Sequence, residues 1–320
     1  MLRDGGVEHR TFRDLPEILR PGDLLVRNET RVIAARLFGA RAGGGKAEVL
    51  LLRPADRERY DPGSVRWLAL VRPGRKLRAG ATVAFGECAT ATVARVHDED
   101  GVRELVFDLH VPFETLLERA GRLPLPPYIH EESAEAQARY QTVFARTPGS
   151  VAAPTASLHF TPEIFERLTA RGVEVAELVL DVGLGTFRPM SGERLDDHVM
   201  HAESYALPEA TVAAVERARR EGRRVVAAGT TVVRALEGNI RKHGRLVAGS
   251  DATDLFISPG FPFAAVDAMI TNFHLPQSTL LVLVSAFAGR ERVLQAYAEA
   301  VREEYRFFSF GDAMFVERAP

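Results

Sequence analysis

The pattern of hydrophobic and polar positions changes along the chain, and the first part of the chain shows the pattern of short strands. Apolar runs predict strands over Leu24–Val26, Arg31–Phe38 and Ala47–Leu52. The turn Gly43–Gly45 precedes the third run, which indicates a hairpin between the second and third strands.

A different pattern occupies the next part of the chain, where short runs rich in valine and threonine are separated by glycine turns. The predicted strands are Val65–Val71, Thr82–Phe85, Thr90–Val96 and Glu104–Leu109. Their even spacing is typical of a small barrel or sandwich. A helix over Phe113–Ala120 and a proline-rich connector over Leu123–Tyr128 follow. We therefore expect residues 57–143 to form an inserted, β-rich domain.

From residue 150 onward, helix-length and strand-length patterns alternate. The predicted helices are Pro162–Arg171, Pro208–Glu221, Thr231–Lys242, Gln277–Ala288 and Arg290–Glu303, and the predicted strands are Val173–Val182, Arg224–Ala228 and Ala268–Thr271. Such alternation is typical of an α/β domain. The expected fold is an α/β main domain, discontinuous over residues 1–56 and 144–320, with an inserted small all-β domain that is barrel-like.

The composition is that of a soluble globular protein of 320 residues, 46% hydrophobic and 26% charged. The single cysteine, Cys88, excludes an intrachain disulfide and fits a reducing cytoplasm. We find no signal peptide, and the longest apolar stretch, Leu280–Ala288, is too short to cross a bilayer. A cytoplasmic protein that does not span a membrane is expected.

The charge of the whole chain is balanced, at a net −2, so it does not by itself indicate a nucleic-acid-binding protein. The densest basic cluster consists of Arg217, Arg219, Arg220, Arg223 and Arg224. It is either the solvated face of a helix or part of a surface that follows a phosphate backbone, because arginine binds phosphate through two parallel hydrogen bonds.

The segment Pro148–Phe160 is the most unusual loop sequence. It combines a Pro-Gly turn, several small residues, a second proline and then His159. Small residues let the backbone approach a ligand closely, and a histidine there can serve as an acid or a base near neutral pH. An ordinary loop with a hydrogen-bonded histidine is the alternative.

Two further segments place glycine and threonine after predicted strands. Thr230 and Thr231 follow Gly229 at the start of a helix, where free N–H groups and the helix dipole favour an anion. The segment 183–188, GLGTFR, lacks the third glycine of a dinucleotide-binding fingerprint. Its Arg188 could pair with a carboxylate or a phosphate.

Three titratable residues, His198, His201 and Glu203, lie within six positions. A zinc site is conceivable, but no cysteine and no His-Glu-x-x-His motif supports it, so an acid–base or hydrogen-bonding role is favoured over a metal site. No metal is expected.

The remaining candidates lie near the C-terminus. Asn272 and His274 follow a short strand, at a position where α/β proteins often bind ligands. The segment YRFFSFGDAM combines aromatic rings with Asp312, so it is either a packed terminal strand or a wall for base stacking with a carboxylate.

Taken together, the motifs resemble the S-adenosylmethionine:tRNA ribosyltransferase-isomerase family of queuosine biosynthesis over essentially the whole chain. The resemblance is carried by residues 9–39, YQTVFARTPGSVAAPTASLHFT at 140–161, VGLGTFRP at 182–189, HVMHAESY at 198–205, GTTVVRALE at 229–237, ITNFHLPQSTLLVLVSAFAG at 270–289 and YRFFSFGDAM at 305–314. The chain departs from the family pattern at Glu29, Ala34, Ser157 and Asp181.

The resemblance implies a reaction in which S-adenosylmethionine donates its ribosyl portion. The acceptor is the aminomethyl group of 7-aminomethyl-7-deazaguanine at the wobble position of a tRNA with a GUN-type anticodon. Epoxyqueuosine-tRNA, adenine and methionine are the products. S-adenosylmethionine is consumed as a substrate, so no cofactor is implied, and we expect a monomer.

The chemistry of this reaction suggests roles for the candidate residues. We expect His159 or His201 to be the base, with Glu203 orienting it or contacting the sulfonium. The residues Thr230, Thr231 and Arg234 would hold the methionine carboxylate or the ribose, Asn272 and His274 would bind adenine or a ribose hydroxyl, and Arg188 and Asp312 are secondary candidates. Two other classes stay open: a non-catalytic tRNA-binding protein and a tRNA methyltransferase that uses S-adenosylmethionine.

Overall fold

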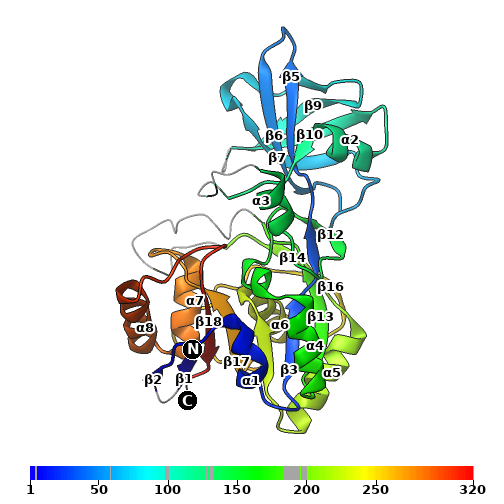
Figure 1. The fold of residues 1–320 in the computed structure, drawn as a ribbon. Coiled ribbons are helices and arrows are strands. Elements are labelled where there is room, and N and C mark those ends of the chain that lie inside the picture. Colours follow the sequence, from blue (N-terminus) through cyan, green and yellow to red (C-terminus); the bar gives the residue numbers. More distant parts are fainter. Residues whose placement is uncertain are drawn as a thin grey trace. The chain divides into compact units, whose positions relative to one another are not determined.

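The computed structural model describes residues 1–3, 6–57, 59–97, 101–126, 129, 133–183, 195 and 200–319. The chain forms two compact units (Figure 1). The first consists of Met1–Thr30, Arg139–Ala145 and Pro154–Pro320, and the second of Arg31–Ala138 and Arg146–Ala153.

The first unit is built on a mixed sheet of nine strands. In spatial order these are β16 (Gly249–Thr253), β14 (Glu203–Leu207), β13 (Glu174–Leu180), β3 (Leu24–Asn28), β15 (Val225–Ala228), β17 (Ala268–Asn272), β18 (Ala313–Glu317), β1 (Leu2–Arg3) and β2 (Gly6–Val7). The four strands β13, β3, β15 and β17 are parallel. Because the carboxyl ends of parallel strands share one edge of a sheet, the loops that follow these strands meet there.

Helices cover the sheet of the first unit on both faces. They are α1 (Leu15–Ile18), α4 (Pro162–Ala170), α5 (Glu209–Arg220), α6 (Thr230–His243), α7 (Thr279–Ala288) and α8 (Arg290–Arg302), with short 3₁₀ turns η1 (Phe12–Asp14) and η3 (Thr155–His159). Leu25, Val226 and Ile270 pack with Leu15 of α1 and Ile164 of α4 in one core. The alternate strand positions, such as Leu24 and Ala227, are equally buried. Burial on both faces explains why the central strands read as continuous apolar runs.

The second unit contains a closed antiparallel barrel. Its strands follow the order β5 (Arg36–Arg41), β6 (Lys46–Pro54), β7 (Arg66–Arg72), β10 (Val102–Leu109), β9 (Ala89–Val96) and β8 (Thr82–Phe85), and β8 pairs back with β5. A two-residue strand, β11 (Gly121–Arg122), also pairs with β5. The helix α2 (Phe113–Ala120) places Phe113 against Trp67, with ring centroids 4.9 Å apart. The predicted barrel-like all-β domain beside an α/β domain is confirmed.

The smaller elements of the second unit complete its description. They are η2 (Gly74–Lys76), α3 (Ala134–Arg139) and a two-stranded pairing of β4 (Thr30–Val32) with β12 (Thr147–Ser150).

The position of the domain boundary differs from the sequence-based expectation. Residues 31–56 were assigned to the α/β domain, but β5 and β6 lie in the barrel and the compact unit begins at Arg31. The predicted strand Arg31–Phe38 is also divided into β4 and β5. The physical reason is that an alternating pattern predicts a strand without specifying its partner, and the pairing of Ala40 with Ala84 is what closes the barrel.

Candidate active site at the carboxyl edge of the parallel strands

Most of the candidate residues lie at the edge of the sheet where the parallel strands end. Thr230 and Thr231 follow β15, whereas Asn272 ends β17 and His274 lies two residues beyond it. Glu203 begins β14, which runs antiparallel to β13 and therefore starts at this same edge. Segments far apart in sequence thus converge on one end of the first unit.

His159 is held at this edge by contacts with two strands and an aromatic ring. Ser157 of η3 donates a hydrogen bond to the carbonyl of Ala228, at the end of β15. The Nε2 atom of His159 lies 2.9 Å from Oδ1 of Asn272. The His159 ring also stacks on Phe12, with centroids 5.1 Å apart. The imidazole is therefore fixed in position and in orientation.

The environment of His159 also determines its protonation. Burial lowers the pKa of His159, while its hydrogen bond to Asn272 and the charge of Asp312 oppose that shift. An amide oxygen only accepts hydrogen bonds, so Nε2 carries the proton and Nδ1 keeps its lone pair. A neutral imidazole with an available Nδ1 can accept a proton from a substrate.

His159 lies on the wall of a cleft of about 390 Å³ in the first unit. This volume is in the range of sites for small molecules. Its floor is apolar, and includes Ile270 and Phe315. Three carboxylates line the cleft together with one guanidinium, that of Arg10, and its aromatic rings include those of Phe12 and Tyr305; the carboxylates are those of Glu303, Glu304 and Asp312. An apolar floor with carboxylates at the wall suits a flat ligand that carries a positive charge.

Two buried polar atoms at this edge have no hydrogen-bond partner among the described residues: Oγ1 of Thr231 and Nδ2 of Asn272. Thr231 lies in the first turn of α6, and its hydroxyl is near Gly229, which has a φ of +107°. Since burying an unpaired polar atom is unfavourable, such atoms in a native fold indicate a missing partner. Together with the free N–H groups at the start of α6, they mark a place where a ligand can bind.

Glu203 and Arg234 form an ion pair inside the first unit, with side chains 4% and 3% exposed. Arg234 also donates hydrogen bonds to the carbonyls of Leu255, at 3.2 Å, and Thr253, at 3.3 Å. The other Glu203 oxygen accepts a hydrogen bond from the N–H of Gly183, at 3.0 Å. The guanidinium is therefore engaged within the protein, and its expected role in holding the substrate stays a prediction.

The other predicted residues occupy varied environments. His274 Nε2 lies 2.8 Å from Oγ1 of Thr271, and burial lowers the pKa of His274 to about 4. Asp312 accepts a hydrogen bond from the N–H of Arg306, at 2.8 Å, and lines the cleft. His201 is exposed, two residues before β14. Of the predicted residues, His159 and Asp312 line the cleft, and Asn272 contacts His159.

Two predicted residues, Arg188 and His198, lie outside the described residues. In the part of the chain that the structure does describe, no group of three or more His, Cys, Asp or Glu side chains is arranged to bind a metal ion. No helix within these same ranges has both the length and the hydropathy needed to cross a bilayer.

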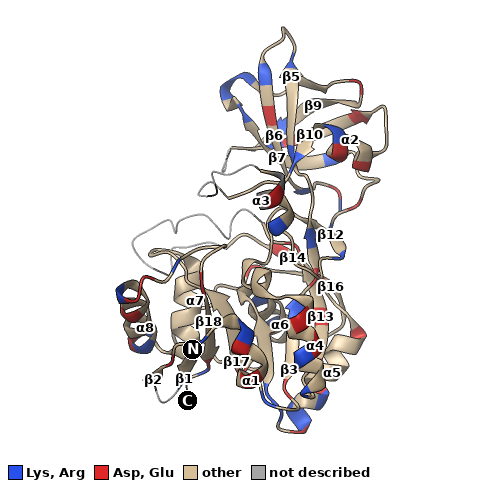
Figure 2. Cartoon of the chain, viewed as in Figure 1, with Lys and Arg blue, Asp and Glu red and all other residues tan. Residues whose placement is uncertain are grey.

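The basic cluster after α5 is largely paired with acidic side chains, and Figure 2 shows both signs of charge around the turn between α5 and β15. Glu174 accepts from Arg217 and Arg223, and Arg224 pairs with Asp23 and Glu317. These pairings favour the interpretation of a solvated face over that of a phosphate-binding surface.

Sequence reasoning did not single out several cleft residues individually. Phe12 was included only in a motif, and Tyr305 only in the C-terminal aromatic segment. The stacking of Phe12 on His159 could not be predicted because the two residues come from separate segments, η1 and η3.

Comparison with known proteins agrees with the motif assignment. A family model described as queuosine biosynthesis protein matches residues 1–316. An S-adenosylmethionine:tRNA ribosyltransferase-isomerase of Moorella thermoacetica is 55% identical over 98% of this chain and 90% of its own length. A protein of the same name from Symbiobacterium thermophilum is 53% identical over 98% of this chain and 89% of its own.

A solved structure was also found, that of an S-adenosylmethionine tRNA ribosyltransferase from Thermotoga maritima. It is 37% identical, with a TM-score of 0.49, over 96% of this chain and 87% of that chain. The family predicted from the sequence motifs is confirmed by the family model and by the near-complete alignment with curated relatives. The chain belongs to the family of queuosine biosynthesis proteins.

Proposed function

We propose that this chain is an S-adenosylmethionine:tRNA ribosyltransferase-isomerase. It transfers and isomerises the ribosyl portion of S-adenosylmethionine onto the aminomethyl group of 7-aminomethyl-7-deazaguanine in tRNA, and it releases adenine and methionine. Relatives of this name align over nearly the whole chain. The structural observation that carries the proposal is His159, oriented by Asn272, on the wall of a cleft that also presents carboxylates and aromatic rings.

The first chemical requirement is a base. A sulfonium makes the hydrogens on its neighbouring 5′ carbon acidic, so a group of moderate pKa can remove one. His159 fits this role because its pKa is lowered by burial and Asn272 leaves Nδ1 as the accepting nitrogen. His201 remains the second candidate, as an exposed imidazole at the same edge of the sheet.

The second requirement is binding of a cationic nucleoside. The carboxylates of Glu303 and Asp312 in the cleft favour a positively charged sulfur, and Phe12 offers an aromatic face. The unpartnered Nδ2 of Asn272 can donate to an acceptor on adenine or on the ribose. We assign Asp312 to the sulfonium side of the cleft on charge alone.

The third requirement is a site for the methionine carboxylate. The start of α6 supplies free backbone N–H groups and the hydroxyls of Thr230 and Thr231. Arg234 acts through other residues. It pairs with Glu203, and Glu203 accepts a hydrogen bond from the N–H of Gly183, the first residue of the GLGTFR segment. Glu203 and Arg234 are therefore proposed as positioning residues.

The remaining parts of the proposal concern cofactors and partners. S-adenosylmethionine is consumed as a substrate, and no metal or redox cofactor is required. The acceptor is a tRNA with a GUN-type anticodon, and the enzyme works as a monomer in the cytoplasm. Arg188 and His274 keep their expected roles in substrate binding, at positions following β13 and β17.

One experiment separates this function from its two rivals. The chain is incubated with S-adenosylmethionine labelled in the adenine ring and with tRNA carrying the aminomethyl base. The proposed enzyme releases labelled adenine only when this tRNA is present. A methyltransferase would instead convert the label to S-adenosylhomocysteine, and a tRNA-binding protein would leave it unchanged; either result would refute the proposal.

A further inference from the structure

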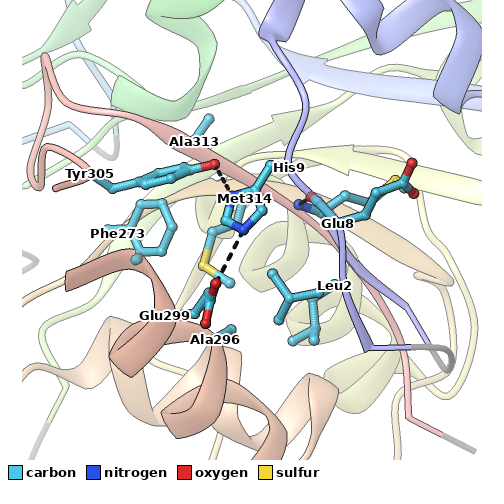
Figure 3. A pocket seen from close by; sticks show the side chains of 12 residues that line it. Leu2, Glu8, His9, Phe273, Ala296, Glu299, Tyr305, Ala313 and Met314 are labelled. Carbon is cyan, nitrogen blue, oxygen red and sulfur yellow. Dashed lines mark hydrogen bonds and ion pairs between the residues drawn. The ribbon is translucent and has the colours of Figure 1, made fainter. Parts of the chain in front are cut away.

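Three polar side chains, one of which lines the cleft, form a continuous hydrogen-bonded relay. The Tyr305 hydroxyl lies 2.6 Å from Nδ1 of His9, and Nε2 of His9 lies 3.3 Å from Oε1 of Glu299. Figure 3 shows the His9 ring between the other two groups. His9 comes from the N-terminal segment and Glu299 from α8, while Tyr305 follows that helix. The relay thus joins distant parts of the chain within the first unit.

The hydrogen bonds of the relay follow from the capacities of its groups. A carboxylate only accepts, so Nε2 of His9 donates to Glu299, and in the tautomer that carries this single ring proton Nδ1 accepts from the hydroxyl of Tyr305. Burial and nearby carboxylates raise the pKa of Tyr305, so its hydroxyl keeps the proton that it donates. Because its hydrogen points toward His9, the Tyr305 hydroxyl oxygen can use its lone pairs to accept a hydrogen bond from another donor.

Tyr305 separates two spaces. It lines the small cavity of about 20 Å³ that also contains His9, and it lines the cleft of about 390 Å³ that contains His159. The small cavity has room for about one water, so only the cleft can admit a substrate. Tyr305 also packs on Phe273, the residue next to the Asn272 that orients His159. The relay therefore holds Tyr305, a residue that lines the cleft, in position.

We propose that Tyr305 contacts the nucleoside portion of S-adenosylmethionine, its hydroxyl oxygen accepting a hydrogen bond from a donor on that nucleoside. His9 and Glu299 are positioning residues that keep the hydroxyl hydrogen directed away from the ligand. This inference rests on the proposed function, because it takes S-adenosylmethionine as the occupant of the cleft. The donor is either the amino group of adenine or a hydroxyl of the ribose.

The test compares Tyr305→Phe, His9→Ala and the double variant, with the exposed Glu291→Gln on the same helix α8 as a control. Loss of one neutral hydrogen bond predicts that Tyr305→Phe raises the Kd and the KM for S-adenosylmethionine by about three- to tenfold, with a smaller effect on kcat. Because His9 acts through the hydroxyl, His9→Ala should weaken binding in the parent chain but add nothing in the Tyr305→Phe background.

Glu299→Gln gives an independent test of the relay, since an amide can donate to Nε2 and reverse the hydrogen bonds of His9. A shift in the Kd in this variant, with Glu291→Gln unchanged, supports the relay. An analogue with hypoxanthine in place of adenine identifies the donor. If its binding no longer responds to Tyr305→Phe, the donor is the amino group, and if the response persists, the donor is a ribose hydroxyl.

The inference and the proposed function fail in different ways. A parent chain that binds S-adenosylmethionine but releases no adenine contradicts the function alone. An active parent whose Tyr305→Phe variant keeps Kd and KM within about twofold contradicts the inference alone. Additive effects of His9→Ala and Tyr305→Phe would also overturn it, because two independent structural contributions would then explain them.

Discussion

Arg234, in the second turn of α6, donates to Glu203 at the start of β14, and neither side chain reaches solvent to more than a few per cent. The pair joins a helix to β14, the second strand from the edge of the sheet, and the Glu203 carboxylate also accepts from the N–H of Gly183. In the sequence these residues stand in separate motifs. Their contact makes both of these predicted site residues part of the frame around the site.

Removal of one partner of this pair should destabilise the fold strongly. Arg234→Ala leaves the Glu203 carboxylate buried without its counter-charge, so we expect a loss of about 3–5 kcal/mol in the free energy of unfolding. Urea denaturation measures it. Arg290→Ala, which removes an exposed cation paired with Glu291, is the control and should change stability by less than about 0.5 kcal/mol. Equal effects of the two variants would contradict the buried pair.

The role of His159 as a base predicts a defined pH dependence. The active form is the neutral imidazole, so kcat/KM should fall as the pH decreases through the lowered pKa of His159. The bond to Asn272 raises that pKa, so Asn272→Ala should move the acidic limb to lower pH. The turnover numbers of the His159→Ala and His201→Ala variants identify the base, because the variant that lacks it should lose turnover. If both variants keep near-parental turnover, neither histidine is the base.

A substitution of Thr231, whose hydroxyl has no partner, distinguishes an effect on stability from an effect on substrate binding. In Thr231→Val the shape is kept and an unsatisfied polar atom is removed, so stability should be unchanged or slightly higher. If the hydroxyl contacts the substrate, the Kd for S-adenosylmethionine should rise by about three- to tenfold. Calorimetry measures both quantities.

Thr211→Val is the matched control, because the Thr211 hydroxyl donates to the carbonyl of Glu177. This variant should lose about 1 kcal/mol of stability and bind S-adenosylmethionine normally. A Thr231→Val variant that loses stability and keeps its affinity would remove Thr231 from the site.

His274 predicts how stability depends on pH. Its folded pKa of about 4 lies below the ordinary histidine value of 6.5, so the unfolded chain binds the proton more readily. The free energy of unfolding should therefore be fully retained above about pH 6.5 and should decrease as the pH falls toward 4, by up to roughly 3 kcal/mol. His274→Gln should flatten this slope, whereas His110→Gln, at an exposed site of the second unit, should leave it unchanged. Denaturant titrations between pH 4 and 7 compare the slopes.

Secondary structure was predictable where local periodicity decides it. The predicted strand Thr82–Phe85 and the helix Phe113–Ala120 have the observed bounds, and the helices α4 to α8 differ by a residue or two. The short strands β14 and β16 were not predicted, because a five-residue antiparallel strand has little periodicity of its own. The family was predictable because its motifs cover the whole chain.

The arrangement of the site was predictable only in part. That Thr231, Asn272 and His274 share one edge follows from the rule for the carboxyl ends of parallel strands. That Arg234 is paired within the protein does not follow, since it depends on which strand begins beside α6. The contribution of Tyr305 to the cleft likewise depends on a tertiary contact with His9, 296 residues away in sequence.

The closure of the barrel in the second unit restricts how any partner can be recognised there. The far side of β5 pairs with β11 at Arg36 and Leu37 and with β8 at Ala40 and Arg41, so both flanks of this strand are occupied by neighbours. Among the described residues, each of the six barrel strands has a paired strand on both sides. A macromolecule that docks on the wall of the barrel is therefore expected to contact side chains and turns, and surface substitutions can change its selectivity while the backbone pairing stays intact.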